Sequence, residues 1–258
     1  MSRSLPYMKP LFGVMIVASL IAVGFIKRDR PISKPIVVPA AGTYTPFAVL
    51  ELFTSEGCSS CPPADDLLPK LARLDSNIIP LSFHVDYWNR LGWQDPFSKV
   101  QYSERQNEYA DHWRLESVYT PELIINGEKE LVGSDEKGAK AAIEKALTNK
   151  ATAEISIDNV TVSATTYSIT CHLEGEWKNS TLLAALVQKT ATVNVRAGEN
   201  EGKKLSHTNV VRSFKHTPAE KKMMIQLDIP KDLAAGNRAV VLYLQNKSTL
   251  GVVAAKMF

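Results

Sequence analysis

Apolar residues follow two different periods on either side of Cys58 and Cys61. Residues 46–53 form a short apolar run bounded by turn residues, which predicts a mostly buried strand. Beyond Cys61 the apolar positions adopt the spacing of one helix face. These positions are Ala64, Leu67, Leu68, Leu71 and Leu74. Pro62 and Pro63 suit the first turn of that helix, because a missing N–H costs little there. We therefore expect the two cysteines to lie at a strand-to-helix junction.

Further apolar runs and turn signals continue this pattern. Residues 77–85 are expected to form a second buried strand. After an aromatic loop, Asp95 is expected to cap a helix that starts at Pro96 and ends near Trp113. Residues 123–132 predict a hairpin, because Asn-Gly lies between two short apolar segments.

A last helix is predicted before residue 150. Ser134 or Asp135 can cap it, and its apolar stripe consists of Ala139, Ala142, Ile143 and Leu147. From about Ala151 the pattern changes to short alternating runs, and Tyr167, Ile169, Cys171 and Leu173 share one face of such a strand. The alternation predicts an all-β, sandwich-like domain with Cys171 as a buried, inert thiol.

Arg3 and Lys9 precede an apolar run at residues 11–26, and Lys27 and Arg28 follow it. This pattern is typical of a signal or anchor segment, so we expect residues 1–30 to direct the rest of the chain out of the cytoplasm. Residues 31–46 are rich in proline, alanine and glycine and read as a linker. An extracytoplasmic location, with membrane contact only through residues 11–26, is therefore the expectation.

The composition is that of an ordinary globular protein, with 45% hydrophobic and 22% charged residues. The net charge of +3 comes without a long basic run, which argues against nucleic acid as a partner. Three cysteines, two of them in one motif, do not make the disulfide framework of a small secreted domain.

The Cys58-Ser-Ser-Cys61 motif carries the main chemical prediction. A helix N-terminus presents free N–H groups and a partial positive charge, which favour a thiolate over a thiol. We expect Cys58 to be the more exposed, attacking sulfur and Cys61 the resolving one. Glu56 opposes thiolate formation, because it places a like charge nearby.

Four segments resemble an uncharacterised bacterial secreted family, domain of unknown function 1223. They are Glu51–Asp65, His84–Ser98, Val118–Pro121 and Gly198–Arg212. The resemblance covers roughly residues 47–258. It implies a thioredoxin-like α/β domain at 47–150, followed by the all-β sandwich-like domain at 151–258, and a redox role outside the cytoplasm.

The thioredoxin-like resemblance also implies roles for particular residues. Thr120-Pro121 would be a loop with a cis peptide bond beside the cysteines, offering backbone hydrogen bonds to a substrate strand. Glu51 would take the proton from Cys61 if the loop carries one inserted residue, because it stands seven positions before Cys58. Two departures from ordinary thioredoxins are the Ser59-Ser60 dipeptide and Gly57, which stands where thioredoxins carry tryptophan.

The predicted function is thiol–disulfide exchange with protein thiols or disulfides, without a cofactor. One alternative is a soft-metal site, such as copper, made of Cys58, Cys61 and His84. Another is a binding module without catalysis. For His84 itself, a structural, hydrogen-bonded role is the simplest interpretation. His207 and its neighbours Asn209 and Arg212 could form a ligand patch, or belong to a loop packed on the first domain.

Overall fold

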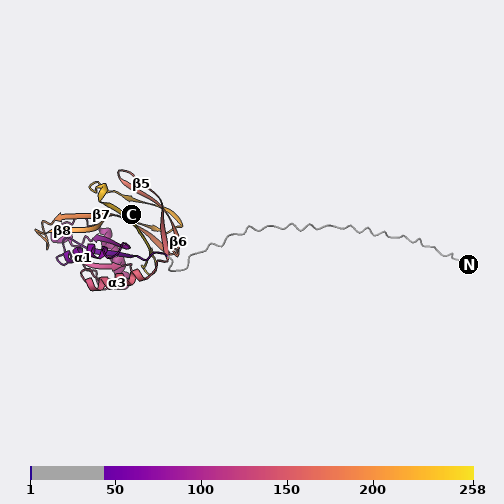
Figure 1. The fold of residues 1–258 in the computed structure, drawn as a ribbon, viewed down its shortest axis with the longest axis horizontal. Coiled ribbons are helices and arrows are strands. Elements are labelled where there is room, and N and C mark those ends of the chain that lie inside the picture. The colour runs from indigo at the N-terminus through magenta and orange to yellow at the C-terminus, as the bar shows by residue number, and fades with distance from the viewer. Residues whose placement is uncertain (2–43) are drawn as a thin grey trace. The chain divides into compact units, whose positions relative to one another are not determined.

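The computed structural model describes Met1 and residues 44–258 (Figure 1). The predicted anchor run at residues 11–26 and most of the linker lie outside the described residues. Within the described part, no helix is both long enough and apolar enough to cross a membrane.

The described residues form eleven strands, three α-helices and two short 3-10 helices. The strands are β1 Ala48–Thr54, β2 Ile78–His84, β3 Glu122–Ile125, β4 Lys129–Val132, β5 Ala153–Val162, β6 Thr166–Gly175, β7 Ser180–Asn194, β8 Lys204–Pro218, β9 Lys222–Asp228, β10 Arg238–Asn246 and β11 Val252–Met257. The α-helices are α1 Pro62–Ala72, α2 Val100–Trp113 and α3 Glu136–Thr148, and the 3-10 helices are η1 Asn89–Leu91 and η2 Ala235–Asn237.

Eight strands form one mixed sheet in the order β11-β10-β7-β8-β2-β1-β3-β4. β1 is parallel to β2, and β2 is parallel to β8 through the pair Ser82 and Val210, while the remaining neighbours are antiparallel. The fold-class prediction is therefore wrong. The chain is mostly β. The strands expected in an α/β thioredoxin-like domain lie in the same sheet as strands of the C-terminal half, because β2 pairs with β8.

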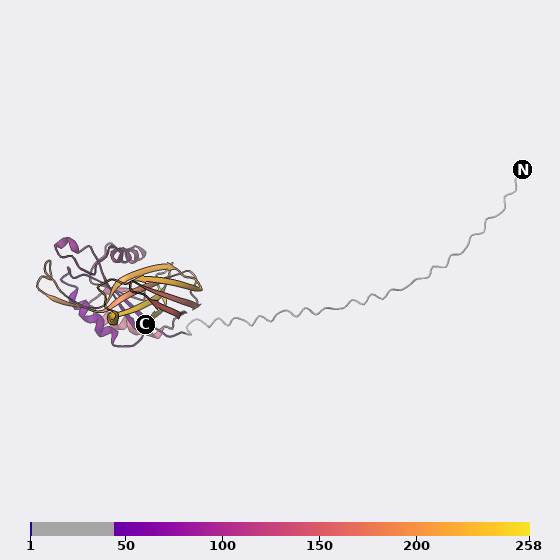
Figure 2. The same ribbon diagram turned by 90° about the horizontal axis from the view of Figure 1, so that it is seen from above.

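Both faces of the long sheet are covered, which explains why β1 and β2 are buried along their whole length. On one face, Leu50 and Leu52 of β1 pack with Leu68 of α1 and Ile143 of α3. On the other face, residues of β1 and β2 such as Phe53 and Phe83 pack with Tyr102 and Tyr109 of α2, together with side chains of β7, β8 and β10. Figure 2 shows helices on both sides of the sheet. The predicted buried strands are thus confirmed.

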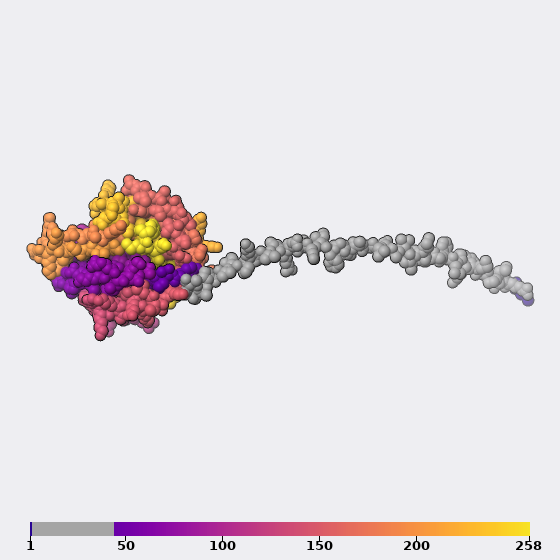
Figure 3. All heavy atoms as spheres, in the orientation of Figure 1, coloured from indigo at the N-terminus to yellow at the C-terminus, as the bar shows by residue number. Residues whose placement is uncertain are grey.

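The remaining strands form a second sheet in the order β5-β6-β9, which packs on β7 and β10. Ile169, Cys171 and Leu173 of β6 face this second core, as their alternation predicts. Cys171 is a free, buried thiol, and burial raises its pKa to about 11. Figure 3 shows α1 and neighbouring surface segments, in indigo and purple, as a band between the pink α3 region and the strands of the C-terminal half.

Candidate functional site

A disulfide joins Cys58 and Cys61 at the N-terminus of α1. The turn after β1 closes when the Cys58 N–H donates to the Ser55 carbonyl at 3.1 Å. Cys61 is the N-cap residue, and its carbonyl accepts the N–H groups of Ala64 and Asp65 at 2.9 and 3.1 Å. The predicted strand-to-helix junction is confirmed. Pro62 and Pro63 carry no N–H, so the partial positive charge that favours a thiolate in the reduced form comes from the dipole of α1.

Both sulfur-bearing residues are fully buried, so the prediction that Cys58 is the more exposed is wrong. The cause is the segment between β7 and β8, which covers the disulfide loop. Asn200, itself fully buried, donates from Nδ2 to the carbonyl oxygens of Glu56 and Cys58 at 2.9 and 2.8 Å. Glu199 accepts the Ser59 N–H at 3.0 Å. Within this turn, Ser59 and Ser60 are the exposed residues.

The Thr120–Pro121 peptide bond is cis and lies beside the disulfide, so the cis prediction is confirmed. The Thr120 carbonyl oxygen is 3.8 Å from the Cys58 sulfur. The Ser60 hydroxyl oxygen is 3.2 Å from that sulfur and 3.3 Å from the Thr120 carbonyl oxygen. The Trp88 indole donates to the Thr120 hydroxyl at 2.8 Å and so holds the loop in place. The structure thus brings Cys58, Cys61 and Thr120-Pro121 together.

Glu51 occupies a different environment. Its carboxylate forms a bidentate ion pair with Arg105 at 2.5 and 2.8 Å. It also accepts hydrogen bonds from the hydroxyls of Tyr109 and Tyr243 at 2.7 and 3.3 Å. Among the contacts of residues 44–258, Glu51 has no hydrogen bond to Cys61. Both of its oxygens are engaged within the core against α2, which gives no support to the expectation that it takes the proton from Cys61.

Glu122 is a second buried carboxyl next to the cis-proline. The Gln106 side chain donates to Glu122 at 2.5 Å and to the Tyr119 carbonyl at 2.7 Å. Burial raises the pKa of Glu122 to about 7, and the nearby Glu130 adds to this rise, while the Gln106 hydrogen bond lowers it. Gln106 therefore connects Glu122 with the loop beside Cys58.

Five charged or titratable residues lie buried beneath the disulfide loop, and we call them the buried polar cluster. They are Glu56, Asp65, His84, Asp95 and His207. They come from the turn after β1, from α1, from the end of β2, from the loop before α2 and from β8. The cluster thus draws on both halves of the chain.

His84 and Asp95 form one half of the cluster. His84 Nδ1 is 2.7 Å from Asp95 Oδ2, and that oxygen also accepts the Glu56 N–H at 2.9 Å. The other Asp95 oxygen accepts the Phe97 N–H at 2.9 Å. Burial tends to raise the pKa of Asp95, but His84 and these N–H groups hold it below its ordinary value. Asp95 does not cap α2 as predicted, because the helix begins at Val100.

His207 lies between two carboxylates in the other half. Its Nε2 is 3.3 Å from Glu56 Oε1, and its Nδ1 is 3.6 Å from Asp65 Oδ2. Burial lowers the pKa of His207, but the two carboxylates outweigh this effect and raise it to about 10. The rings of His84 and His207 are 4.7 Å apart and nearly perpendicular.

The sequence offered only a weak signal for this cluster. Asp65 follows Cys61 by four positions, on the turn that carries the apolar stripe, so its burial could have been suspected. The sequence predicts His207 in a ligand patch or in a loop packed on the first domain, but it belongs to strand β8. The alternative metal site of Cys58, Cys61 and His84 is not assembled here. His84 lies against carboxylates, and the two cysteines are bonded to each other.

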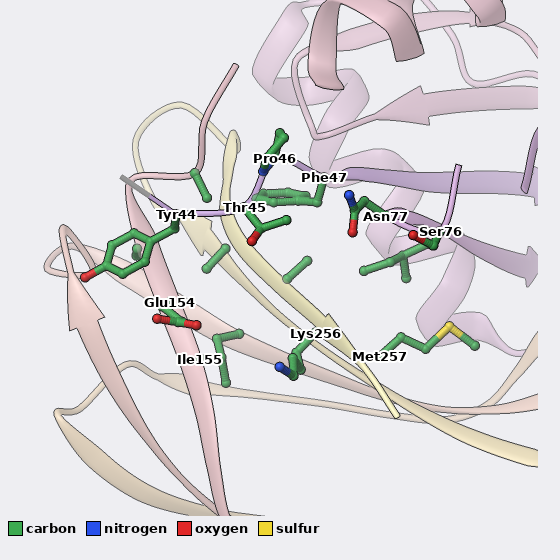
Figure 4. Close-up of a pocket in the computed structure, with 15 residues that line it drawn as sticks. Tyr44, Thr45, Pro46, Phe47, Ser76, Asn77, Glu154, Ile155, Lys256 and Met257 are labelled. Atoms are coloured by element: carbon green, nitrogen blue, oxygen red, sulfur yellow. The ribbon is translucent and has the colours of Figure 1, made fainter. Parts of the chain in front are cut away.

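A separate cavity of about 310 Å³ lies at the other end of β1. Figure 4 shows Tyr44, Thr45 and Phe47 on one side of it and Lys256 and Met257 of β11 on another. Its lining includes no residue of the disulfide loop or of the buried polar cluster. We therefore place the candidate site at Cys58 and Cys61.

Comparison with solved structures identifies two similar folds. Protein AGR_C_4864 from Agrobacterium tumefaciens is 28% identical, with a TM-score of 0.62, over 83% of this chain and 94% of that one. HBP35 of Porphyromonas gingivalis is 16% identical, with a TM-score of 0.59, over 84% of this chain and 76% of that one, and this likeness concerns the fold alone.

No curated protein matches the chain. Residues 49–245 match the model of the family described as "Protein of unknown function (DUF1223)". This range covers the disulfide loop, the cis-proline loop and every member of the buried polar cluster. The chain therefore belongs to the DUF1223 family.

Proposed function

We propose that this protein is a thiol–disulfide oxidoreductase that exchanges electrons with a protein partner through Cys58 and Cys61. The observation that carries the proposal is the position of their disulfide, at a helix N-terminus and beside the Thr120 carbonyl group. A purely structural disulfide would not need a helix N-terminus to stabilise a thiolate.

Each step of the exchange forms one S–S bond and breaks another. A thiolate of the partner attacks the Cys58 sulfur, the Cys58–Cys61 bond breaks, and Cys61 leaves as a thiolate that takes up a proton. A second partner thiolate then attacks the partner's own sulfur in the mixed disulfide and releases Cys58. Two electrons pass from the partner dithiol to the pair, and the reverse sequence reduces a partner disulfide.

Local groups support Cys58 as the sulfur that forms the mixed disulfide. The Ser60 hydroxyl, 3.2 Å away, can donate to a Cys58 thiolate and so stabilise it. Thr120 and Pro121 offer backbone groups to an extended partner segment beside the sulfurs. Because Cys58 is buried, the partner reaches it only when the turn at Ser59 and Ser60 moves outward.

The test uses full-length protein and a synthetic peptide with one internal disulfide. The Cys61→Ser variant, once reduced, should accumulate a mixed disulfide between Cys58 and the peptide, because the resolving sulfur is missing. The Cys58→Ser variant should form none, and Cys171→Ala is the matched control that should exchange like the wild type. Full exchange by Cys58→Ser would refute the mechanism.

We also propose an extracytoplasmic site of action, with residues 11–26 as the export or anchor segment. An oxidising compartment would maintain a disulfide of this kind. Protease added to spheroplasts should digest the protein carrying a C-terminal tag. Digestion only after lysis would place the folded part in the cytoplasm and contradict this proposal.

A further inference from the structure

The buried polar cluster leaves hydrogen-bonding atoms without partners. Glu56 Oε1, His84 Nε2 and both ring nitrogens of His207 are buried and lack a hydrogen bond among the described residues, although Glu56 and Asp65 face the two His207 nitrogens at 3.3 and 3.6 Å. Native proteins rarely bury so many unsatisfied polar atoms in one place, and an ion or a functional role commonly explains them. These atoms belong to residues that supply metal ligands elsewhere: two imidazoles and one carboxylate.

We propose that the buried polar cluster is a binding site for a divalent transition-metal ion, with zinc as the representative ion. His84 Nε2, His207 Nε2 and Glu56 Oε1 are the assigned ligands. Two nitrogen donors with one carboxylate suit zinc and its first-row neighbours better than magnesium or calcium, which prefer oxygen ligands. This assignment does not depend on the proposed exchange at Cys58.

One distance between two of the assigned ligand atoms agrees with such a site. Zinc binds nitrogen and oxygen at about 2.0–2.2 Å, so two ligands of a tetrahedral ion lie about 3.4 Å apart. His207 Nε2 and Glu56 Oε1 are 3.3 Å apart. One potential ligand atom from each of Glu56, His84 and Asp95 lies within 4.8 Å of the others, a group that contains Asp95 and not His207.

Asp95 is assigned to a supporting role despite this proximity. Both of its oxygens are already used, by His84 Nδ1 and by the N–H groups of Glu56 and Phe97. Histidine ligands usually donate their second N–H to a carboxylate, which fixes the ring and leaves the other nitrogen free for the metal. Asp95 stands in that position behind His84, and Asp65 stands 3.6 Å from Nδ1 of His207.

Glu56 is held in a similar way. Its second oxygen, Oε2, accepts the Trp93 indole N–H at 2.7 Å, while Oε1 remains free and lies next to His207. Glu56 Oε1 and His207 Nε2 thus face each other at 3.3 Å, and His84 Nε2 is a further unpartnered atom of the cluster. This arrangement leaves a fourth position to water or to another ligand.

The first measurement uses full-length wild-type protein in its disulfide form, stripped with a chelator and then equilibrated with zinc chloride. After gel filtration, metal analysis should find one zinc per chain, and the melting temperature should rise with zinc. The Cys58→Ser/Cys61→Ser variant should bind equally well, because the cysteines are not ligands. Folded wild-type protein without bound zinc, or loss of zinc only in the cysteine variant, would overturn the proposal.

Variants identify the ligands. Glu56→Gln keeps the shape of the side chain, and both this variant and His84→Ala/His207→Ala should lose stoichiometric zinc. Asp95→Asn should weaken binding by about 10- to 100-fold, as supporting residues do. His172→Ala, at the partly exposed His172–Asp158 pair on β6, is the matched control and should bind normally. Zinc retained by the double histidine variant would refute the site.

The visible spectrum of cobalt-loaded wild-type protein tests the assigned ligands without relying on the folding of any variant. Cobalt(II) added to the metal-free protein should give the visible bands of a four-coordinate nitrogen and oxygen site. A strong thiolate-to-cobalt charge-transfer band would show cysteine ligands instead. The spectrum of unliganded aqueous cobalt would show that the cluster holds no metal, and either result contradicts the proposal.

Discussion

The Asn200 side chain donates a hydrogen bond to the Cys58 carbonyl oxygen at 2.8 Å, across a separation of 142 residues. The same amide group also donates to the Glu56 carbonyl. Asn200 lies in the connection between β7 and β8, so a residue of the C-terminal half fixes the backbone of the cysteine loop. The accessibility of the disulfide is therefore set by a segment distant in sequence.

Asn200→Ala should loosen the disulfide loop. The change leaves two buried carbonyl groups without their donors, which should lower the free energy of unfolding by about 2 kcal/mol. The loop should also open more often, so reduction of the disulfide by glutathione should become faster. The measurement is the rate of thiol appearance under native conditions. Asn107→Ala, at an exposed residue of α2, is the control and should leave this rate unchanged. An unchanged rate in Asn200→Ala would show that the contact does not limit access.

Glu51 should matter for stability and not for proton transfer. Arg105, enclosed by the aromatic rings of Phe83, Tyr109, Phe214 and Tyr243, depends on Glu51 for charge compensation. Removing one partner of such a buried ion pair typically costs about 3–5 kcal/mol. Glu51→Gln should therefore lower the denaturant midpoint.

The thiol chemistry of the same variant should stay normal. We expect the pH profile for alkylation of reduced Cys61 in Glu51→Gln to match that of the wild type. A displaced profile would mean that Glu51 does exchange protons with Cys61 in the reduced protein. The comparison is made at temperatures where both proteins are folded, so that lost stability does not imitate lost chemistry.

The sequence predicted local features well because short-range patterns determine them. The buried strands and the junction at Cys58 follow from neighbouring residues, whereas the cis bond before Pro121 is implied by the resemblance to thioredoxin-like proteins. The pairing of β2 with β8 depends on contacts more than a hundred residues apart, and no apolar period encodes it. This pairing made the fold-class prediction wrong, because it joins two groups of strands that were expected to form separate domains.

The same limit explains what was missed in the site. Asp95 carried a plausible helix-cap signal, yet it bonds to His84 and Glu56. The burial of Cys58 depends on Asn200, and the buried polar cluster depends on His207 of β8. Only the folded arrangement brings these residues together. The Cys58-Ser-Ser-Cys61 motif therefore does not predict that the segment containing Asn200 buries the two cysteines.

Glu122 should make stability depend on pH. Its pKa in the folded protein is about 7, above the ordinary 4.5, so the folded state binds the proton more tightly than the unfolded state. The stabilisation is fully present below pH 4.5 and is lost as the pH rises to about 7, by at most about 3 kcal/mol.

Glu122→Gln should remove this part of the pH dependence, because glutamine does not titrate. Urea unfolding of both proteins between about pH 5 and about pH 8, which covers most of the range from 4.5 to 7, measures the difference. The free energy of unfolding of each protein is expressed relative to its own value at about pH 5. The two curves should converge at low pH and separate as the pH rises, because the wild type loses stability that the variant keeps. Parallel curves would show that Glu122 titrates normally.

A redox titration of the full-length protein in glutathione buffers tests the central claim most directly. The measured quantity is the fraction of Cys58 and Cys61 that can be alkylated after unfolding at each redox potential. The account predicts a reversible two-electron transition for this pair, with Cys171 unaffected. A disulfide that stays oxidised across the whole glutathione range would identify a structural cross-link and contradict the proposed exchange reaction.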